Sequence, residues 1–128
     1  MRVLLDTQAA LYLWMAPDRL GHSARIVLED PTNVLLFSQV STWEICLKFQ
    51  IGKLPLLSSP EKYLRKRIQE SDLTYEPISD RALFDTVSLP HHHGDPFDRL
   101  LLATAQSLKV PIVSGDRNFP RYPVDVIW

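Results

Sequence analysis

The sequence has a single cysteine, no long apolar run and almost no net charge, and each of these absences excludes a class of protein. Cys46 is the only cysteine among 128 residues, so a disulfide within the chain is excluded. The longest apolar stretch, residues 9–16, is less than half of the roughly 18 to 20 residues that a membrane-spanning helix needs. With a net charge of -1, any binding of nucleic acid has to use a local basic patch.

The same features bear on the compartment. The first six residues, MRVLLD, place three apolar residues before an acid, against the roughly 7 to 15 apolar residues of a secretory signal. We therefore expect a cytoplasmic protein without a membrane segment. Cys46 lies inside an apolar helical pattern, which favours a buried thiol in a reducing compartment over a catalytic nucleophile.

Ten prolines divide the chain into segments of alternating character. Short apolar runs predict buried strands at residues 2–6, 33–38, 110–116 and 124–128. Longer segments with apolar residues at intervals of three and four predict helices at residues 7–15, 23–30, 39–54, 59–71, 79–89 and 95–110. Because alternating strands and helices imply right-handed crossovers, we expect one α/β domain over residues 1–128, with a mainly parallel sheet covered on both faces.

Acidic residues near the ends of the predicted strands are candidates for a site, because such sheets bind ligands beyond the carboxyl ends of their strands. Asp6 ends the first predicted strand and Asp116 follows a later one, so both should emerge at the same rim. Glu44 lies in the apolar stripe of the helix at residues 39–54, where an unpaired carboxylate carries a large desolvation cost. Glu44 therefore pairs with a cation, marks a site, or reaches water from the edge of the stripe.

The segment DPFDR predicts a helix start that accounts for two further acids without any function. Asp95 fits the N-cap, Pro96 the first helical position and Asp98 the first turn, where an acid favours the exposed amides and the helix dipole. Asp98 also shares a face with Leu101 and Leu102, and that face should pack on the sheet. We expect Asp95 to act as a cap, whereas capping and function are both open for Asp98.

The four acids Asp6, Glu44, Asp98 and Asp116 need a cation if they converge. Two carboxylates about 5 Å apart repel by roughly 3 kcal/mol at an effective dielectric of about 20, so four of them would not stay ionised unaided. A cluster of oxygen ligands suits Mg²⁺ or Mn²⁺. Such an ion activates a bound water and stabilises the charge that develops on a phosphate during cleavage.

Four ordered segments of the chain resemble those of PIN domains of the VapC toxin type. They are residues 4–14 (LLDTQAALYLW), 40–54 (VSTWEICLKFQIGKL), 89–105 (LPHHHGDPFDRLLLATA) and 112–128 (IVSGDRNFPRYPVDVIW). The resemblance implies a three-layer α/β/α fold and a Mg²⁺- or Mn²⁺-dependent endoribonuclease, which hydrolyses RNA phosphodiester bonds with a carboxylate-bound metal and an activated water. It also implies the toxin half of a bacterial toxin–antitoxin pair, with a cognate antitoxin protein as partner.

The resemblance further implies a homodimer, and the apolar and basic surface of the helices at residues 7–15 and 61–70 favours one. It assigns metal binding and catalysis to four acids and supporting roles to two hydroxyl groups: Asp6, Glu44, Asp98, Asp116, Thr7 and Ser114. Three positions depart from the family pattern. Gln8 stands where relatives often carry histidine, Ser114 replaces a frequent threonine, and Gly94 replaces a common arginine. None of them removes an acid, so they bear on contacts with the substrate.

Three consecutive histidines, residues 91–93, precede the predicted helix start. Adjacent residues of an extended chain point in opposite directions, so three consecutive imidazoles chelate one ion poorly. The only other histidine is His22, far away in the sequence. We therefore expect no dedicated histidine metal site and assign His92 and His93 to packing of the loop near the acids.

Basic residues suggest where a polyanion would bind. Lys62, Arg65 and Lys66 share one face of the helix at residues 59–71, which is typical of a solvated helix side. Arg99 and Arg117 each directly follow a proposed metal-binding acid, so we predict that their guanidinium groups contact a phosphate of the RNA substrate.

Two other functions compete with the nuclease. A phosphohydrolase of the haloacid dehalogenase type needs a second acid two residues after the first, and position 8 is Gln8. A PIN-fold interaction or RNA-binding module without nuclease activity stays open, because an acidic quartet shows only a capacity to bind metal.

Overall fold

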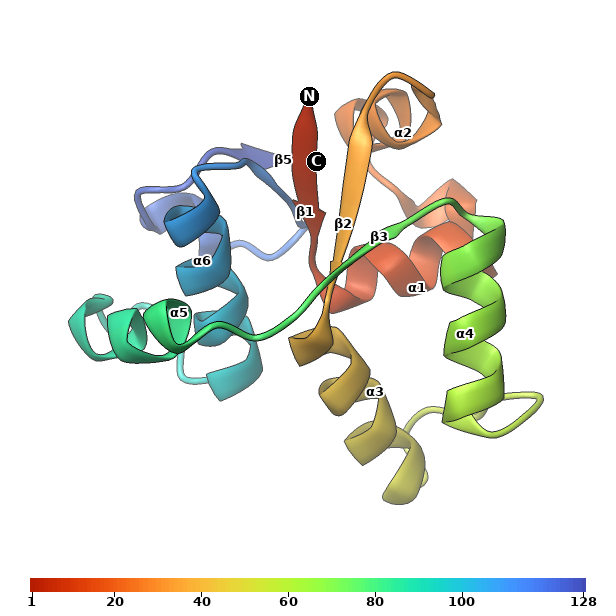
Figure 1. The fold of residues 1–128 in the computed structure, drawn as a ribbon. Helices are drawn as coiled ribbons and strands as arrows, with labels where there is room; N and C mark the ends of the chain where they lie inside the picture. Colours follow the sequence, from red (N-terminus) through yellow and green to blue (C-terminus); the bar gives the residue numbers. More distant parts are fainter.

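The computed structural model describes residues 1–128 as a five-stranded sheet with helices on both faces (Figure 1). The strands are β1 (Arg2–Leu5), β2 (Val34–Ser38), β3 (Thr74–Glu76), β4 (Ile112–Val113) and β5 (Val126–Ile127), in the spatial order β3-β2-β1-β4-β5. All four neighbouring pairs are parallel. The predicted parallel sheet is confirmed, and β1 lies at its centre.

Six α-helices connect the strands, one in each predicted helical segment. They are α1 (Thr7–Met15), α2 (His22–Glu29), α3 (Gln39–Gln50), α4 (Pro60–Glu70), α5 (Asp80–Asp85) and α6 (Pro96–Leu108). Polar side chains fix most of the starting points by accepting hydrogen bonds from the first backbone amides, and these N-caps are Asp6, Ser38, Ser59, Ser79 and Asp95. Short 3-10 helices follow at Pro17–Arg19, Thr86–Ser88 and Phe119–Arg121.

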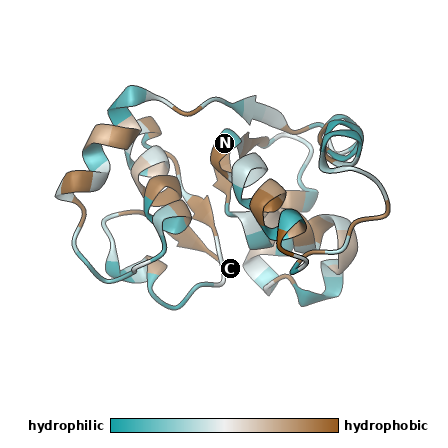
Figure 2. Ribbon diagram, turned by 90° about the horizontal axis from the view of Figure 1, so that it is seen from below, coloured by the Kyte–Doolittle hydropathy of each residue, from teal (hydrophilic) through white to brown (hydrophobic).

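The core consists of two hydrophobic clusters, one on each face of the sheet, which confirms the three-layer α/β/α arrangement. One cluster joins the sheet to α1, α2 and α4, and the other joins it to α5 and α6. Alternate residues of β1 explain the division, because Val3 and Leu5 belong to the first cluster and Leu4 to the second. Figure 2 shows the helices in two groups on either side of the strands, with hydrophobic and hydrophilic residues on each.

Helix α3 leaves the sheet at the carboxyl end of β2 and contributes to both clusters, through Val40 on one side and Ile45 on the other. The rest of the apolar stripe predicted for this helix is not in the core. Trp43, Leu47 and Ile51 are exposed. Figure 1 shows that α3 runs away from the sheet.

Strand β3 was not among the predicted strands. It has three residues, Thr74–Glu76, none of them fully buried, and it forms the edge of the sheet beside β2. Such a short polar segment carries no apolar alternation from which a strand could be predicted. None of the helices combines the length and the apolar composition that crossing a bilayer requires.

Candidate active site

The four acids singled out in the sequence line one cavity of about 290 Å³. Asp6 follows β1, Glu44 lies in the second turn of α3 after β2, and Asp116 comes three residues after β4. Since these strands are parallel, their carboxyl ends meet at one edge of the sheet. Asp98 reaches the same cavity from the first turn of α6. The structure therefore brings together residues that are up to 110 positions apart in the chain.

Asp6 is buried at the junction of β1 and α1. Its Oδ1 atom accepts a hydrogen bond of 2.6 Å from the amide of Ala9, so the residue also caps α1. Burial raises the pKa of Asp6 to about 6, against the lowering effect of the Ser114 hydroxyl and the Ala9 amide; Glu44 and Asp116 raise it further. In the absence of a cation, this carboxyl group is therefore unusually reluctant to ionise.

Of the alternatives that its sequence position left open, Glu44 pairs with a cationic side chain, and it also lines the acidic cavity. Its Oε2 atom forms an ion pair of 2.8 Å with the ammonium group of Lys48, one helical turn later. Its Oε1 atom is buried and has no hydrogen-bond partner. The side chain is only 6% exposed, so this oxygen has lost water without gaining a protein donor. A cation in the cavity would supply the missing partner.

Asp95 and Asp98 have different roles at the start of α6. Oδ1 of Asp95 accepts hydrogen bonds from the amides of Phe97 at 2.8 Å and Asp98 at 3.1 Å, so Asp95 is the predicted N-cap. Asp98 makes no capping bond. Burial raises its pKa to about 7, the charges of Asp95, Glu44 and Asp6 add to this shift, and His93 opposes it.

Asp116 is held by its own loop and by a histidine. The Asn118 amide donates to its Oδ1 at 2.8 Å, and its own amide donates to the Ser114 hydroxyl at 3.1 Å. Its Oδ2 lies 2.9 Å from Nε2 of His93, and the same nitrogen lies 3.1 Å from Oδ2 of Asp98. His93 thus joins two of the acids.

The position of His93 differs from the packing role expected of it. His91 is exposed, and His92 lies edge-on against the ring of Tyr122, with centroids 5.2 Å apart. Only His93 turns toward the acids. The alternation of an extended loop predicted that neighbouring histidines would diverge, but it did not indicate which one would face the site.

The remaining walls combine predicted and unexpected residues. Thr7 shares a buried hydrogen bond of 2.8 Å with Ser41 and lines the cavity, whereas Ser114 lies behind Asp6 and Asp116. Trp128 closes one side and fits tightly against Gly115, where an added Cβ would lie 2.7 Å from the indole ring. The sequence contained no local signal for Trp128, because its contact with Gly115 depends on the pairing of β4 with β5.

Arg99, which was predicted to contact a substrate phosphate, is bound to its own loop in this structure. Its guanidinium group donates to the carbonyl oxygens of Thr86, Leu89, Pro90 and His93 at 2.9 to 3.5 Å. Arg99 therefore holds together the loop that precedes α6 and does not line the cavity. A guanidinium group can satisfy several carbonyl groups at once, and here both terminal nitrogens donate to the loop.

Other basic residues are better placed for a polyanion. Arg117 is exposed beside Asp116 and forms no ion pair or hydrogen bond. A second cavity of about 470 Å³ adjoins the acidic one, since both are lined by Gln8, Tyr12 and Lys48. Arg19 and Lys53 line this adjoining cavity as well. On α4, by contrast, Arg65, Lys66 and Arg67 pair with acids of their own helix, as expected of a solvated face.

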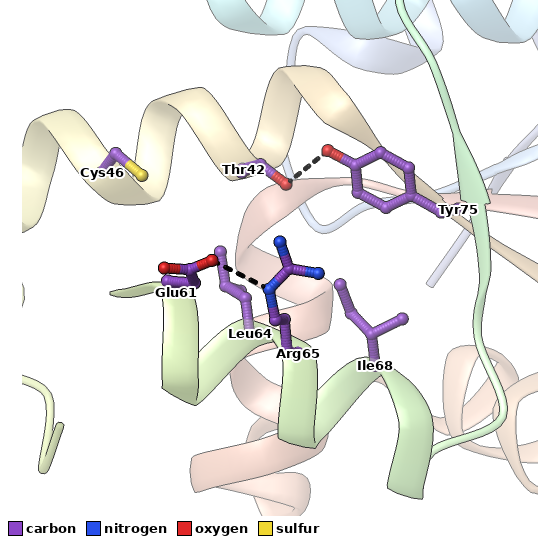
Figure 3. Close-up of a pocket in the computed structure, with 7 residues that line it drawn as sticks. All are labelled: Thr42, Cys46, Glu61, Leu64, Arg65, Ile68 and Tyr75. Carbon is purple, nitrogen blue, oxygen red and sulfur yellow. Dashed lines mark hydrogen bonds and ion pairs between the residues drawn. The ribbon is translucent and has the colours of Figure 1, made fainter. Parts of the chain in front are cut away.

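A third cavity, also about 470 Å³, lies between α3 and α4 and contains Cys46 (Figure 3). Cys46 is exposed there, so the expectation of a buried thiol is wrong. The reason is that this side of α3 faces a groove toward α4 instead of the core. The only acid of the groove, Glu61, already pairs with Arg65 at 3.1 Å. The groove therefore offers nothing comparable to the acidic centre.

The acidic cavity fits a divalent cation by its charge balance. Five carboxylates and one ammonium group line it: Asp6, Glu44, Asp95, Asp98, Asp116 and Lys48. Burial is the main cause of the raised pKa values of Asp6 and Asp98, and the neighbouring carboxylates add to it; a cation would offset these shifts and would give Oε1 of Glu44 a partner. Oxygen donors of this kind suit a hard ion such as Mg²⁺ or Mn²⁺.

Comparison with solved structures shows where this fold occurs. VapBC2 from Rickettsia felis, bound to a promoter DNA fragment, contains a chain with a TM-score of 0.71 and 15% identity, covering 98% of this chain and 97% of that one. FitAcB from Neisseria gonorrhoeae contains a chain with a TM-score of 0.64 and 18% identity. The match covers 97% of this chain and 95% of that one. A toxin–antitoxin complex from Klebsiella pneumoniae contains a chain with a TM-score of 0.63 and 21% identity. The match covers 98% of this chain and 96% of that one.

At these identities the likeness shows the fold alone. No curated protein matches the sequence significantly. The family model for the PIN domain, however, matches residues 3–125, which include all five acids of the cavity. The chain therefore belongs to the PIN domain family.

Proposed function

We propose that this protein is a Mg²⁺- or Mn²⁺-dependent endoribonuclease and the VapC-type toxin of a bacterial toxin–antitoxin pair. The observation that carries the proposal is the buried Oε1 atom of Glu44, which has no partner in a cavity that it shares with four more carboxylates. A buried oxygen in this situation is costly for a protein that only binds partners elsewhere. It is useful for one that binds a cation.

Asp6, Glu44 and Asp98 would hold the metal ion, with Asp116 as the fourth acid. When bound, the ion lowers the pKa of a coordinated water and stabilises negative charge on a phosphate. The residues around it orient the ligands: the Ala9 amide fixes Oδ1 of Asp6, and Lys48 fixes Oε2 of Glu44. Thr7 and Ser114 support these acids from the walls of the site.

The substrate phosphates would follow the basic residues that adjoin the acids. Arg117 lies next to Asp116, and Lys48, Lys53 and Arg19 line the neighbouring cavity. Arginine and lysine side chains bind the phosphates of a strand without reading its sequence. An RNA strand crossing the acidic cavity would thus meet cations on both sides of the bond to be cut.

The proposed partners are a second copy of the chain and an antitoxin protein, within the cytoplasm. Large apolar side chains are exposed on α3 (Trp43 and Leu47), on α5 (Leu83 and Phe84) and at Val87. This is not the surface expected from the sequence, since α1 is mostly packed into the core. Exposed apolar side chains on two helices favour a homodimer through α3 and α5. The proposal of an antitoxin partner rests on solved structures with the same fold, which include VapBC2 and a toxin–antitoxin complex.

The first experiment measures melting and cleavage together. The purified protein is melted in EDTA, in Mg²⁺ and in Mn²⁺, and is then incubated with pooled RNA under the same conditions. A metal ion at about 100 times its Kd stabilises the folded state by about 2.7 kcal/mol. The melting temperature should therefore rise under the same metal conditions in which RNA is cut. The Asp6→Asn variant should show neither effect. Absence of both effects in the wild-type protein would favour an interaction module without nuclease activity.

The second experiment tests the toxin role in cells. Production of the wild-type chain alone should arrest growth of a bacterial host, and Asp6→Asn should be tolerated at the same protein level. Co-production of the cognate antitoxin should restore growth of cells that make the wild-type chain. Equal toxicity of both forms would mean that the arrest does not come from the acidic site.

A further inference from the structure

His93 lies between two acids that come from different parts of the fold. Asp98 belongs to α6, and Asp116 belongs to the loop after β4. Nε2 of His93 is 3.1 Å from Oδ2 of the first and 2.9 Å from Oδ2 of the second. These two acids form no hydrogen bond with each other. The imidazole is thus the group that joins them.

The other ring nitrogen determines which atom of His93 carries the proton. The backbone amide of Asp95 donates a hydrogen bond of 3.1 Å to Nδ1. An Nδ1 atom that accepts a hydrogen bond carries no hydrogen, so the neutral ring has its proton on Nε2. The hydrogen-bond network therefore assigns the Nε2–H tautomer, and this N–H group donates to Oδ2 of Asp116, with Oδ2 of Asp98 lying 3.1 Å from the same nitrogen.

The ring has little freedom to turn away. Its side chain is 15% exposed, and it lies edge-on to the buried ring of Phe119, with centroids 6.1 Å apart. Its backbone carbonyl accepts a weak hydrogen bond from Arg99, which also holds the loop on the other side. The orientation of the imidazole is thus fixed by the loop, by the start of α6 and by the segment after β4.

We propose that His93 is a positioning residue, which donates its Nε2–H to Asp116, contacts Asp98 with the same nitrogen and so holds these two carboxylates at the spacing that metal binding needs. In the assigned tautomer Nε2 carries the proton and acts as a donor, whereas metal binding at this nitrogen would require that proton to leave. It leaves Oδ1 of Asp98 without a hydrogen bond and so available to an ion. This role rests on the proposed metal-dependent activity.

The three consecutive histidines provide matched controls for the test. Metal binding is measured by calorimetry, with Mg²⁺ and with Mn²⁺, for the wild type and for His91→Ala, His92→Ala, His93→Ala and His93→Gln. Each variant is also melted in EDTA, and RNA cleavage is followed as a function of metal concentration. The histidine tautomers of the metal-free wild type are read separately from their nitrogen chemical shifts by NMR.

We expect His93→Ala to raise the Kd for both ions by about 10- to 100-fold, as is typical when a group that orients metal ligands is removed. Saturating metal should restore most of its cleavage rate. His93→Gln should recover much of the affinity, because its amide N–H replaces Nε2–H. His92→Ala should change only the melting temperature, since this ring packs on Tyr122. His91→Ala should change nothing, because the residue is exposed.

Several results would overturn this role. Unchanged metal affinity in His93→Ala would mean that His93 only packs in its loop. Equal losses in His93→Ala and His93→Gln, larger for Mn²⁺ than for Mg²⁺, would make it a direct nitrogen ligand. An Nδ1–H tautomer in the metal-free protein would remove the donor. If the wild type neither binds metal nor cuts RNA, the proposed function fails, and the NMR measurement still decides whether His93 is the donor between the two acids.

Discussion

The backbone amide of Asp98 donates a hydrogen bond of 3.1 Å to Oδ1 of Asp95. The first acid therefore caps the helix that carries the second acid into the cavity. Two chemically identical side chains, three residues apart, are in this way separated into a structural role and a proposed metal-binding role. The pair allows a direct test, because each carboxylate can be removed without the other.

We expect Asp95→Ala to lower the free energy of unfolding by about 0.5 to 2 kcal/mol, which is the usual cost of losing an N-cap. Metal binding and cleavage should persist in the folded fraction. Asp98→Ala should leave the stability of the metal-free protein nearly unchanged or higher, because repulsion among the buried acids decreases. It should abolish stabilisation by Mg²⁺. Urea unfolding with and without Mg²⁺ measures both effects, and loss of metal binding in Asp95→Ala alone would reverse the two assignments.

The metal-free protein should lose stability as the pH rises from the ordinary aspartate value of 3.8 through about 6 to 7. The pKa values of Asp6 and Asp98 are raised to about 6 and about 7 in the folded state, mainly by burial. The folded protein therefore keeps protons that the unfolded chain releases near its ordinary value of 3.8. The stabilisation is complete below that value and is lost above the folded pKa. For Asp6 the shift corresponds to about 3 kcal/mol.

Urea unfolding in EDTA between pH 4.5 and about 8 measures this loss, with Asp6→Asn as the control that should flatten the curve. Mg²⁺ should have the opposite dependence. It competes with protons for the same carboxylates, so its stabilising effect should grow with pH. A metal-free protein that becomes more stable from pH 5 to pH 8 would contradict the raised pKa values.

The two arginines that follow proposed metal-binding acids should behave differently. Arg99→Ala removes hydrogen bonds to several loop carbonyl groups, and we expect it to cost about 2 to 4 kcal/mol of stability. Arg99→Lys should not restore it, because an ammonium group lacks the planar fork of donors. Arg117→Ala should leave the melting temperature within about 1 °C, since the side chain is exposed and unpaired.

Arg117→Ala should instead raise the KM for RNA several-fold and reduce the salt dependence of binding, because a contact with phosphate is lost. Thermal melting and steady-state cleavage at two salt concentrations separate the two arginines. If Arg99→Ala melts like the wild type and raises KM, its guanidinium group faces the substrate in solution.

The proposed homodimer predicts that a charge on the exposed face of α5 will separate the subunits. Phe84→Asp introduces a carboxylate where the native side chain is 65% exposed in the single chain, so the fold of the subunit should be kept. Leu57→Asp is the matched control, because Leu57 is fully exposed in the loop between α3 and α4 and belongs to neither α3 nor α5. Light scattering at micromolar concentration should give a dimer for the wild type and the control and a monomer for Phe84→Asp. A monomeric wild type would count against the interface.

The sequence alone determined the layers of this protein and the identity of its acids. Apolar runs gave four of the five strands, and helical periodicity located all six helices, because both signals are local and repeat along the chain. The N-cap at Asp95 and the candidate acids also followed from local rules, with the family resemblance in support. The apolar stripe of α3 was sufficient to mark Glu44 as a residue that needs a partner.

The tertiary structure decided which partner each side chain meets. The apolar pattern along α3 could not show that Cys46 faces a groove or that Trp43 is exposed. Periodicity shows which residues share a helix face, but it does not show what packs against that face. The donors of Arg99 and the tautomer of His93 depend on loop carbonyl and amide groups that only the folded chain brings near. Directional bonds of this kind require positions in three dimensions, and residue order fixes those only through the packing of the whole domain.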